Sequence, residues 1–243
     1  MNRKHILIGL VVCLLSGMAG FQIYKYRLRA IHLKTSLVQS DKWNAHVTRF
    51  QAAEAPVGTS IILGDSLIEQ FPDSLLGFDD YMNWGIGGEF TSTLLGRLAP
   101  LGRLSPDYVM LMVGVNDIVA NESPAAVRSN YSEIIKVIRR DCPDTELLVC
   151  SCLPTSFVSG WLAENDRTNQ EVRGLNAFLQ QRCTEPGTRF VNVYPLLESD
   201  GQLASEFTID GIHLNERGYR LWARKVRDVL LSDEASVTHA GDA

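Results

Sequence analysis

The sequence predicts an α/β fold in which helices cover both faces of a five-stranded parallel sheet, as a three-layer α/β/α sandwich. From residue 59 onwards, short apolar segments of strand type alternate with segments of helical periodicity. Residues 108–114 are apolar throughout, which is typical of a parallel strand buried on both faces. Five strands favour an open sandwich over an eight-stranded barrel.

The composition is that of a globular protein. The chain has 243 residues, 45% of them hydrophobic and 21% charged, which is enough for one sizeable core. Its net charge is −5 and its body has no dense cluster of lysine and arginine, so a nucleic-acid-binding face is not expected. Histidine and cysteine do not recur at metal-ligand spacing, so we expect no metal and no cofactor.

Residues 1–24 form an unusual N-terminal segment. A basic start, Arg3-Lys4, precedes sixteen uncharged residues at 6–21. This length lies between a signal-peptide core and a full membrane span. We expect a membrane anchor, with a cleaved signal segment as the alternative. Taken alone, the basic residues after the segment would place the body in the cytoplasm by the positive-inside rule. The start resembles an export signal, so we expect an extracytoplasmic, periplasmic body, secreted if the segment is cleaved.

Three further regions follow along the chain. Residues 25–57 read as a helical connector, in which Trp43, Val47 and Phe50 share one apolar face that would pack on the domain edge. Residues 58–232 form the main domain, and residues 233–243 read as a flexible tail. Cys142 and Cys183 each precede a predicted strand and would allow a disulfide if those strands are neighbours.

The elements of the main domain follow from local patterns. Strands are expected at residues 60–64, 81–84, 108–114, 146–152 and 189–193. A helix is expected at 91–103, and a second begins at Ser123 and Pro124, the preferred N-cap and first-turn residues. Thr168 with Glu171 suggests a capping box for a third helix. Asn215 opens the last helix.

Ser66 follows the first strand at a turn into a helix. Such a serine has an exposed hydroxyl, and its backbone N–H lies at the positive end of the helix dipole. Both features suit a nucleophile whose attack creates an oxyanion. Gly-Asp-Ser is also ordinary turn chemistry, so this stretch alone does not assign a function.

His213 and Asp210 follow the fifth strand, at the same edge of the predicted sheet as Ser66. Asp210 precedes the histidine by three residues on a turn containing glycine, so its carboxylate can reach the imidazole. A base held by an acid is the arrangement that activates a serine. Asp65 is a competing acid, but adjacent side chains on a turn diverge, and we interpret it as a turn or cap residue.

The same edge offers donors for an oxyanion. These are the backbone N–H groups of the Gly87-Gly88 turn and of Ser66, and the Asn116 amide. Each has an alternative interpretation. The glycines could form only a tight loop, or a phosphate cradle, although no Gly-Lys-Ser/Thr partner follows. Asn116-Asp117 could form an Asx turn.

These residues resemble a known family. Residues 58–232 are similar to the SGNH, or GDSL-type, esterase/lipase superfamily. The four matching blocks are Gly64-Asp65-Ser66-Leu67, Asn83-Trp84-Gly85-Ile86-Gly87-Gly88-Glu89, Gly114-Val115-Asn116-Asp117 and Asp210-Gly211-Ile212-His213. Each block is short, but four in order at strand ends make a specific match. Glu89-Phe90 stands where Asp-Thr or Asp-Ser is common, which leaves the loop geometry and the substrate open.

The resemblance implies a flavodoxin-like fold. It implies Ser66 as nucleophile with Asp210 and His213, and an oxyanion hole of the Ser66 N–H, the Gly88 N–H and the Asn116 side chain. The block at residues 83–89 is most similar to the small acetylhydrolases, including platelet-activating-factor acetylhydrolase catalytic subunits.

The expected function is a serine esterase acting through an acyl-enzyme. The substrate would be a short acyl or O-acetyl ester of a glycan or lysophospholipid. The alternatives are an O-acyltransferase to a carbohydrate hydroxyl and a non-catalytic, membrane-tethered glycan-binding domain. Residues 153–165, with Phe157 and Trp161, either border the pocket or form a loop packed over these aromatics.

Overall fold

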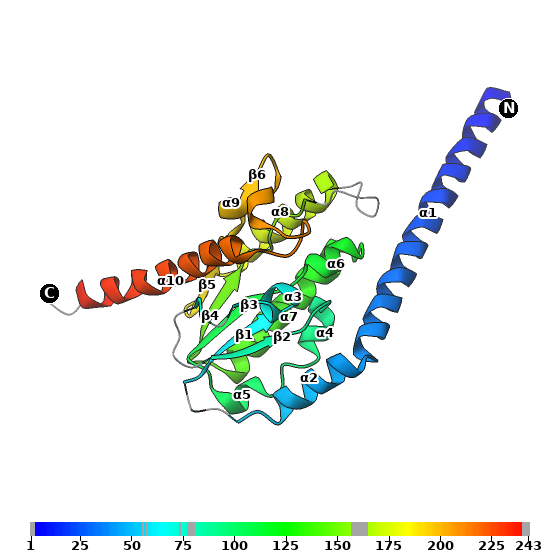
Figure 1. The fold of residues 1–243 in the computed structure, drawn as a ribbon. Coiled ribbons are helices and arrows are strands. Elements are labelled where there is room, and N and C mark those ends of the chain that lie inside the picture. The colour runs from blue at the N-terminus through cyan, green and yellow to red at the C-terminus, as the bar shows by residue number, and fades with distance from the viewer. Residues whose placement is uncertain are drawn as a thin grey trace.

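The computed structural model describes residues 3–54, 56, 58–72, 74–76, 81–156 and 165–239, with many side chains left out in residues 3–27, at 165 and from 232 onwards. Five parallel strands form one sheet in the order β2-β1-β3-β4-β5 (Figure 1). They are β1 (Ser60–Gly64), β2 (Tyr81–Gly85), β3 (Tyr108–Met112), β4 (Glu146–Cys150) and β5 (Thr188–Val191). This is the flavodoxin-like order of a doubly wound sheet, so the predicted α/β sandwich is confirmed.

Successive strand residues point to opposite faces, as the pleat requires. Ile61 and Leu63 enter one core cluster, whereas Ile62 enters the other. The first face is covered by α2 (Asp41–Gln51), α4 (Thr91–Leu95), α5 (Leu101–Leu104), α7 (Pro124–Asp141) and α8 (Asn165–Arg182). The second is covered by α3 (Ser66–Glu69), α9 (Tyr194–Leu197) and α10 (Glu216–His239). The remaining elements are α1 (Arg3–Val38), α6 (Val115–Val119), η1 (Ser205–Phe207) and the antiparallel pair β6 (Glu198–Ser199) and β7 (Gln202–Leu203).

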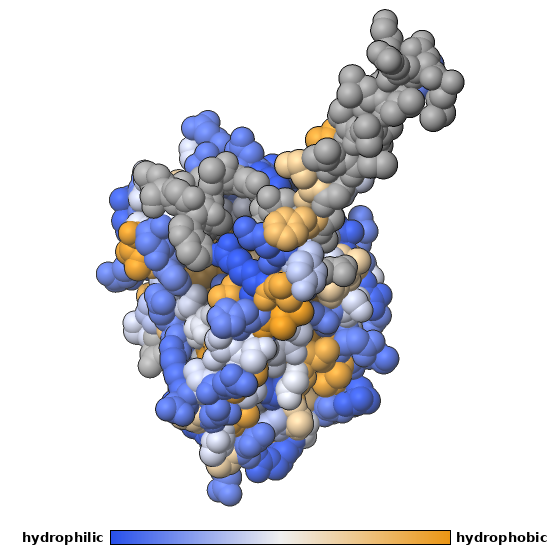
Figure 2. Space-filling view, turned by 90° about the vertical axis from the view of Figure 1, so that its right-hand side faces the viewer, coloured by the Kyte–Doolittle hydropathy of each residue, from blue (hydrophilic) through white to orange (hydrophobic). Residues whose placement is uncertain are grey.

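Helix α1 extends away from the domain, and its C-terminal end meets the domain beside α4 and α6 (Figure 1). Ala30 is buried there, and Leu37 packs against Phe90 and Ala120. Figure 2 shows apolar side chains near the place where α1 joins the body. Among the residues described, no helix has both the length and the apolar character needed to cross a bilayer. The described residues therefore give no support to the expected membrane span at residues 1–24. Most side chains of that segment lie outside the described part of the chain.

Several element boundaries differ from the predictions. The helix expected at 91–103 is split into α4 and α5, because Gly96 and Pro100 lie between them and both residues disfavour a helix interior. The third and fourth strands end at Met112 and Cys150, two residues earlier than expected. The capping box at Thr168 is wrong, since α8 begins earlier, at Asn165. Helix α10 runs through His239, into the segment expected to be a tail.

Cys142 and Cys183 are free thiols, so the disulfide considered from sequence is not formed. The strands that follow them, β4 and β5, are neighbours, as that disulfide would have required. Burial raises the pKa of the Cys183 thiol to about 11 and also raises that of Cys142. Both cysteines therefore stay protonated at neutral pH and react slowly with oxidants. Phe157 and Trp161 lie outside the described residues.

Candidate active site

Ser66 is placed by the sharp turn at the end of β1. A Cβ atom at Gly64 would come within 1.9 Å of the Met112 carbonyl oxygen, so the close approach of β1 and β3 requires glycine there. Asp65 then caps α3, because its Oδ1 accepts from the Leu67 N–H at 3.0 Å. Ser66 is therefore the first residue of α3, with a half-buried side chain. A backbone N–H in this position has no acceptor within its own helix.

The structure brings Ser66, His213 and Asp210 together. Ser66 Oγ lies 2.9 Å from His213 Nε2, and His213 Nδ1 lies 2.6 Å from Asp210 Oδ2. A carboxylate beside Nδ1 favours the tautomer that carries its proton there, which leaves the Nε2 lone pair directed at the serine hydroxyl. This chain of contacts can remove a proton from Ser66.

Asp210 is held in its charged form. Partial burial acts to raise its pKa, but hydrogen bonds from the His213 imidazole and from the backbone N–H groups of His213 and Ile212 outweigh it. The pKa of Asp210 is therefore lowered from its ordinary value, and the carboxylate is available to stabilise an imidazolium. The Ser156 N–H donates to the Gly211 carbonyl at 2.8 Å, which ties this loop to the segment that follows β4.

Gly88 lies in a tight turn beside the Ser66 loop. The Glu89 N–H donates to the Ile86 carbonyl at 3.2 Å, and Gly88 has a φ of +80° between them. That angle suits glycine and strains other residues. The Ile86 N–H donates in turn to the Gly64 carbonyl at 3.0 Å, so the turn is joined to β1 two residues before Ser66.

Asn116 reaches the same turn from the start of α6. Its Nδ2 donates to the Glu89 carbonyl at 3.0 Å. A side-chain amide has two N–H groups, so the second remains for a ligand. Asp117 does not make the Asx turn that the sequence suggested for Asn116-Asp117. Its carboxylate instead accepts from the Thr91 N–H at 2.9 Å and from the Thr91 hydroxyl at 2.7 Å. The residues named from sequence for an oxyanion hole therefore form one connected group.

Asp65 has the capping role expected from sequence, but its environment is unusual. Its side chain is fully buried, and Oδ2 has no hydrogen-bond partner among the described residues. Burial raises the pKa of Asp65 to about 7, with smaller contributions from the Glu89 and Asp117 charges. The group is thus poised to change protonation near neutral pH.

Asp65→Asn is expected to change how stability depends on pH. The folded state binds the Asp65 proton more tightly than the unfolded chain, where aspartate titrates near about 3.9, so wild type loses stability as the pH rises from about 4 to 7. Asparagine does not titrate. The free energy of unfolding of the variant should therefore rise relative to that of wild type by up to about 1.4 kcal/mol per pH unit, and the difference should level off above pH 7. Urea unfolding across this range measures the difference.

Asp141→Asn is the matched control for this measurement. The hydrogen bond from Arg140 lowers the pKa of Asp141, which is the opposite direction. The free energy of unfolding of Asp141→Asn should not rise relative to that of wild type as the pH rises. A stability difference between Asp65→Asn and wild type that stays constant with pH would contradict the assignment.

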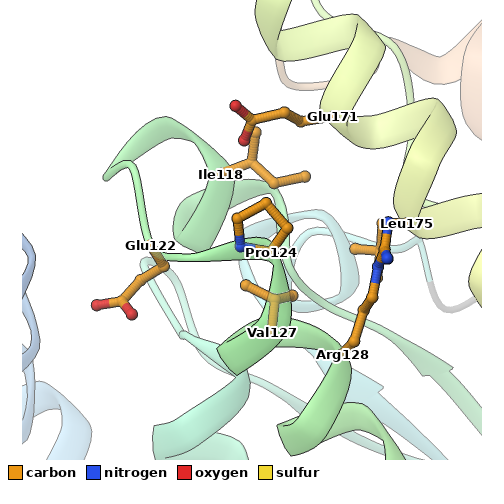
Figure 3. A pocket seen from close by; sticks show the side chains of 7 residues that line it. All are labelled: Ile118, Glu122, Pro124, Val127, Arg128, Glu171 and Leu175. Carbon is orange, nitrogen blue, oxygen red and sulfur yellow. The ribbon is translucent and has the colours of Figure 1, made fainter.

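A separate hollow lies between α6, α7 and α8 (Figure 3). Its lining is Ile118, Glu122, Pro124, Val127, Arg128, Glu171 and Leu175. Ile118 follows Asn116 by two residues, about 200° around the helix axis, so the hollow and the Asn116 amide lie on different sides of α6. None of the residues proposed from sequence for catalysis lines it.

The sequence reading missed the contribution of the N-terminal helices to this region. Trp43 of α2 donates from Nε1 to Glu89 Oε1 at 3.3 Å, and Lys34 of α1 pairs with Glu122 at 2.8 Å. The apolar face containing Trp43 was visible in the sequence, and it does pack on the core. Its polar partner was not visible, because the pairing depends on how α2 docks.

Comparison with known proteins places this geometry in context. The model of the GDSL-like lipase/acylhydrolase family matches residues 62–221. The human platelet-activating factor acetylhydrolase IB subunit alpha1 is 26% identical over 205 residues, which cover 80% of this chain and 85% of that protein. An N-acylneuraminate cytidylyltransferase of Streptococcus agalactiae is 23% identical over 65% of this chain, but the match covers only 35% of that protein.

Solved structures share the fold. A protein from Streptococcus pneumonia, whose description refers to platelet activating factor, is 26% identical with a TM-score of 0.72. The match covers 84% of this chain and 99% of that one. A GDSL-like lipase from Bacteroides thetaiotaomicron is 21% identical with a TM-score of 0.68, and the match covers 78% and 97% of the two chains.

Proposed function

The chain belongs to the GDSL-like lipase/acylhydrolase family and is an ester-hydrolysing enzyme, and from that premise we propose that it is a serine esterase that forms an acyl-enzyme on Ser66. The observation that carries this proposal is the pair of contacts from Ser66 Oγ to His213 Nε2 at 2.9 Å and from His213 Nδ1 to Asp210 Oδ2 at 2.6 Å. The proposed domain that performs the reaction is residues 58–232, and helix α2 packs on its core.

The proposed reaction has two halves. His213 takes the Ser66 proton as the hydroxyl attacks the ester carbonyl, and Asp210 stabilises the resulting imidazolium. The N–H groups of Ser66 and Gly88 and the free N–H of the Asn116 amide stabilise the oxyanion. His213 then protonates the departing alcohol, and water hydrolyses the acyl-enzyme with His213 again as base.

We further propose that the acyl group is short, an acetyl group or one of similar size, on a glycan or lysophospholipid. The name of the human relative describes an acetylhydrolase of a lipid, and the name of the Streptococcus agalactiae relative refers to an acylated sugar. The first name supports a small acyl group, and the two names together leave two classes of alcohol, which an assay can separate.

A series of p-nitrophenyl esters from acetyl to palmitoyl tests the acyl preference. We expect kcat/KM to be highest for acetyl to butyryl esters and to fall at least about tenfold for longer chains, because extra methylenes must fit a site shaped for a small group. The Ser66→Ala variant gives the background rate. The highest kcat/KM on palmitoyl ester would contradict the proposal.

Two alternatives are separated by product and labelling assays. An O-acyltransferase would acylate an added carbohydrate acceptor, whereas an esterase releases free acid with or without it. A non-catalytic glycan-binding domain would not react with a serine-directed fluorophosphonate. We expect wild type to be labelled and Ser66→Ala not to be labelled. An unlabelled wild type would favour the binding domain.

A further inference from the structure

Glu89 and Arg97 form a buried ion pair next to the candidate site. Their side chains are 0% and 1% exposed. Arg97 Nε donates to Glu89 Oε2 at 2.7 Å, and Arg97 Nη2 contacts the same oxygen. The guanidinium also lies 5.2 Å from the centroid of the Phe50 ring. Burial of two charges is costly unless both are well satisfied, so this pair strongly favours one arrangement of the residues around it.

The backbone of Glu89 contacts both sides of the expected oxyanion hole. Its N–H closes the turn that contains Gly88, and its carbonyl accepts from Asn116 Nδ2 at 3.0 Å. Arg97 Nη2 also donates at 2.7 Å to the carbonyl of Trp84, the second-last residue of strand β2, just before the glycines. The ion pair therefore holds the backbone on both sides of the glycine turn.

Helix α2 completes the arrangement from outside the region that matches the family model. Trp43 Nε1 donates to the second Glu89 oxygen, Oε1, at 3.3 Å. Phe50 stacks on Trp84 with ring centroids 4.8 Å apart. The sequence showed Glu89 as a departure from the common aspartate, and the longer side chain is the one that meets both Arg97 and Trp43 here.

We propose that Glu89, Arg97 and Trp43 form a positioning cluster that orients the Gly88 N–H and the Asn116 amide toward the oxyanion. The cluster does not touch the substrate, and it acts through the turn at residues 86–89. This inference rests on the proposed esterase function.

Glu89→Gln tests the positioning role, because it keeps the size of the side chain and removes its charge. We expect kcat to fall about 10- to 100-fold while KM stays within about twofold of the wild-type value. This fall in kcat should not exceed the fall caused by removing one oxyanion donor. The melting temperature should also fall, since Arg97 is left buried without its counter-charge. Rates are compared at a temperature at which circular dichroism shows the variant folded.

Glu146→Gln is the matched control. It breaks the Arg189–Glu146 pair, whose Nε–Oε1 distance is 2.5 Å and which lies at the opposite end of the strands from Ser66. This variant should lose stability while kcat stays within about twofold of wild type. A kcat for folded Glu89→Gln as high as that of the control would overturn the proposal.

Two further variants keep the test decisive. Trp43→Phe retains an aromatic ring and removes one hydrogen bond to Glu89, and we expect it to fold and to lower kcat about threefold or more. In an Asn116→Ala background, Glu89→Gln should cost less than it does alone, because part of its effect runs through Asn116. An unchanged kcat in Trp43→Phe would overturn the proposed positioning role. So would a double variant whose fold-loss in kcat equals the product of the losses of Glu89→Gln and Asn116→Ala. Wild type without esterase activity would instead refute the proposed function.

Discussion

Replacing Ser66 with alanine is expected to lower kcat by about five to six orders of magnitude on any ester that the wild type hydrolyses. The hydroxyl lies 2.9 Å from His213 Nε2, and without it no acyl-enzyme can form. Some acceleration over water should survive, because the oxyanion donors and the binding surface remain. KM should change little, since the hydroxyl contributes mainly to the chemical step. Steady-state kinetics with a p-nitrophenyl ester measures both.

Two comparisons make this result specific. Ser132→Ala removes an exposed hydroxyl on α7 that donates to the Arg128 carbonyl at 3.0 Å, and it should leave kcat unchanged. His213→Ala should cost about as much as Ser66→Ala, and the double variant little more, because the two groups act as a unit. A Ser66→Ala enzyme that kept more than a few per cent of wild-type kcat would show that another group is the nucleophile.

The placement of Ser66 and His213 could be predicted because of a property of parallel sheets. All strands end at one edge, so loops far apart in the chain meet there whatever their separation in sequence. Ser66 follows β1, Asn116 follows β3, and His213 lies in the segment between β5 and α10. Strand positions were readable from apolar runs and the parallel direction from the alternation of strands with helices, and parallel strands bring the loops that follow them to one edge.

The contacts around Glu89 could not be predicted in the same way. Trp43 and Glu89 are 46 positions apart, and their hydrogen bond depends on the docking of α2 against the first face of the sheet. No periodic pattern encodes that docking beyond the apolar face of α2. The break between α4 and α5 was, by contrast, present in the sequence, since Gly96 and Pro100 are both poor residues for a helix interior.

The unformed disulfide shows another limit of sequence. The disulfide was considered on the condition that the two strands are neighbours, and they are, yet neighbouring strands do not fix the positions of the two sulfur atoms. Cys142 caps the end of α7 and packs in the apolar core, and Cys183 follows α8 at the edge of the same cluster. Both act as small apolar side chains.

Asn116→Ala is expected to lower kcat by about two to three orders of magnitude, or about 3–4 kcal/mol of barrier. One N–H of the amide is bound to the Glu89 carbonyl at 3.0 Å, so the amide plane is fixed before substrate arrives. The second N–H is the proposed donor to the oxyanion. KM should stay within about threefold, because this bond strengthens mainly in the transition state.

The stability of the same variant separates catalysis from folding. The lost bond to Glu89 is one neutral hydrogen bond, with a net contribution of about 0.5–1.5 kcal/mol to the free energy of unfolding. The effect on the barrier should therefore exceed the effect on stability at least twofold. Asn44→Ala, which removes an exposed amide that donates to the Val38 and Ser40 carbonyls, should leave kcat within about twofold. If Asn116→Ala changed kcat no more than Asn44→Ala does, Asn116 would have no place in the oxyanion hole, and the N–H groups of Ser66 and Gly88 would have to stabilise the charge alone.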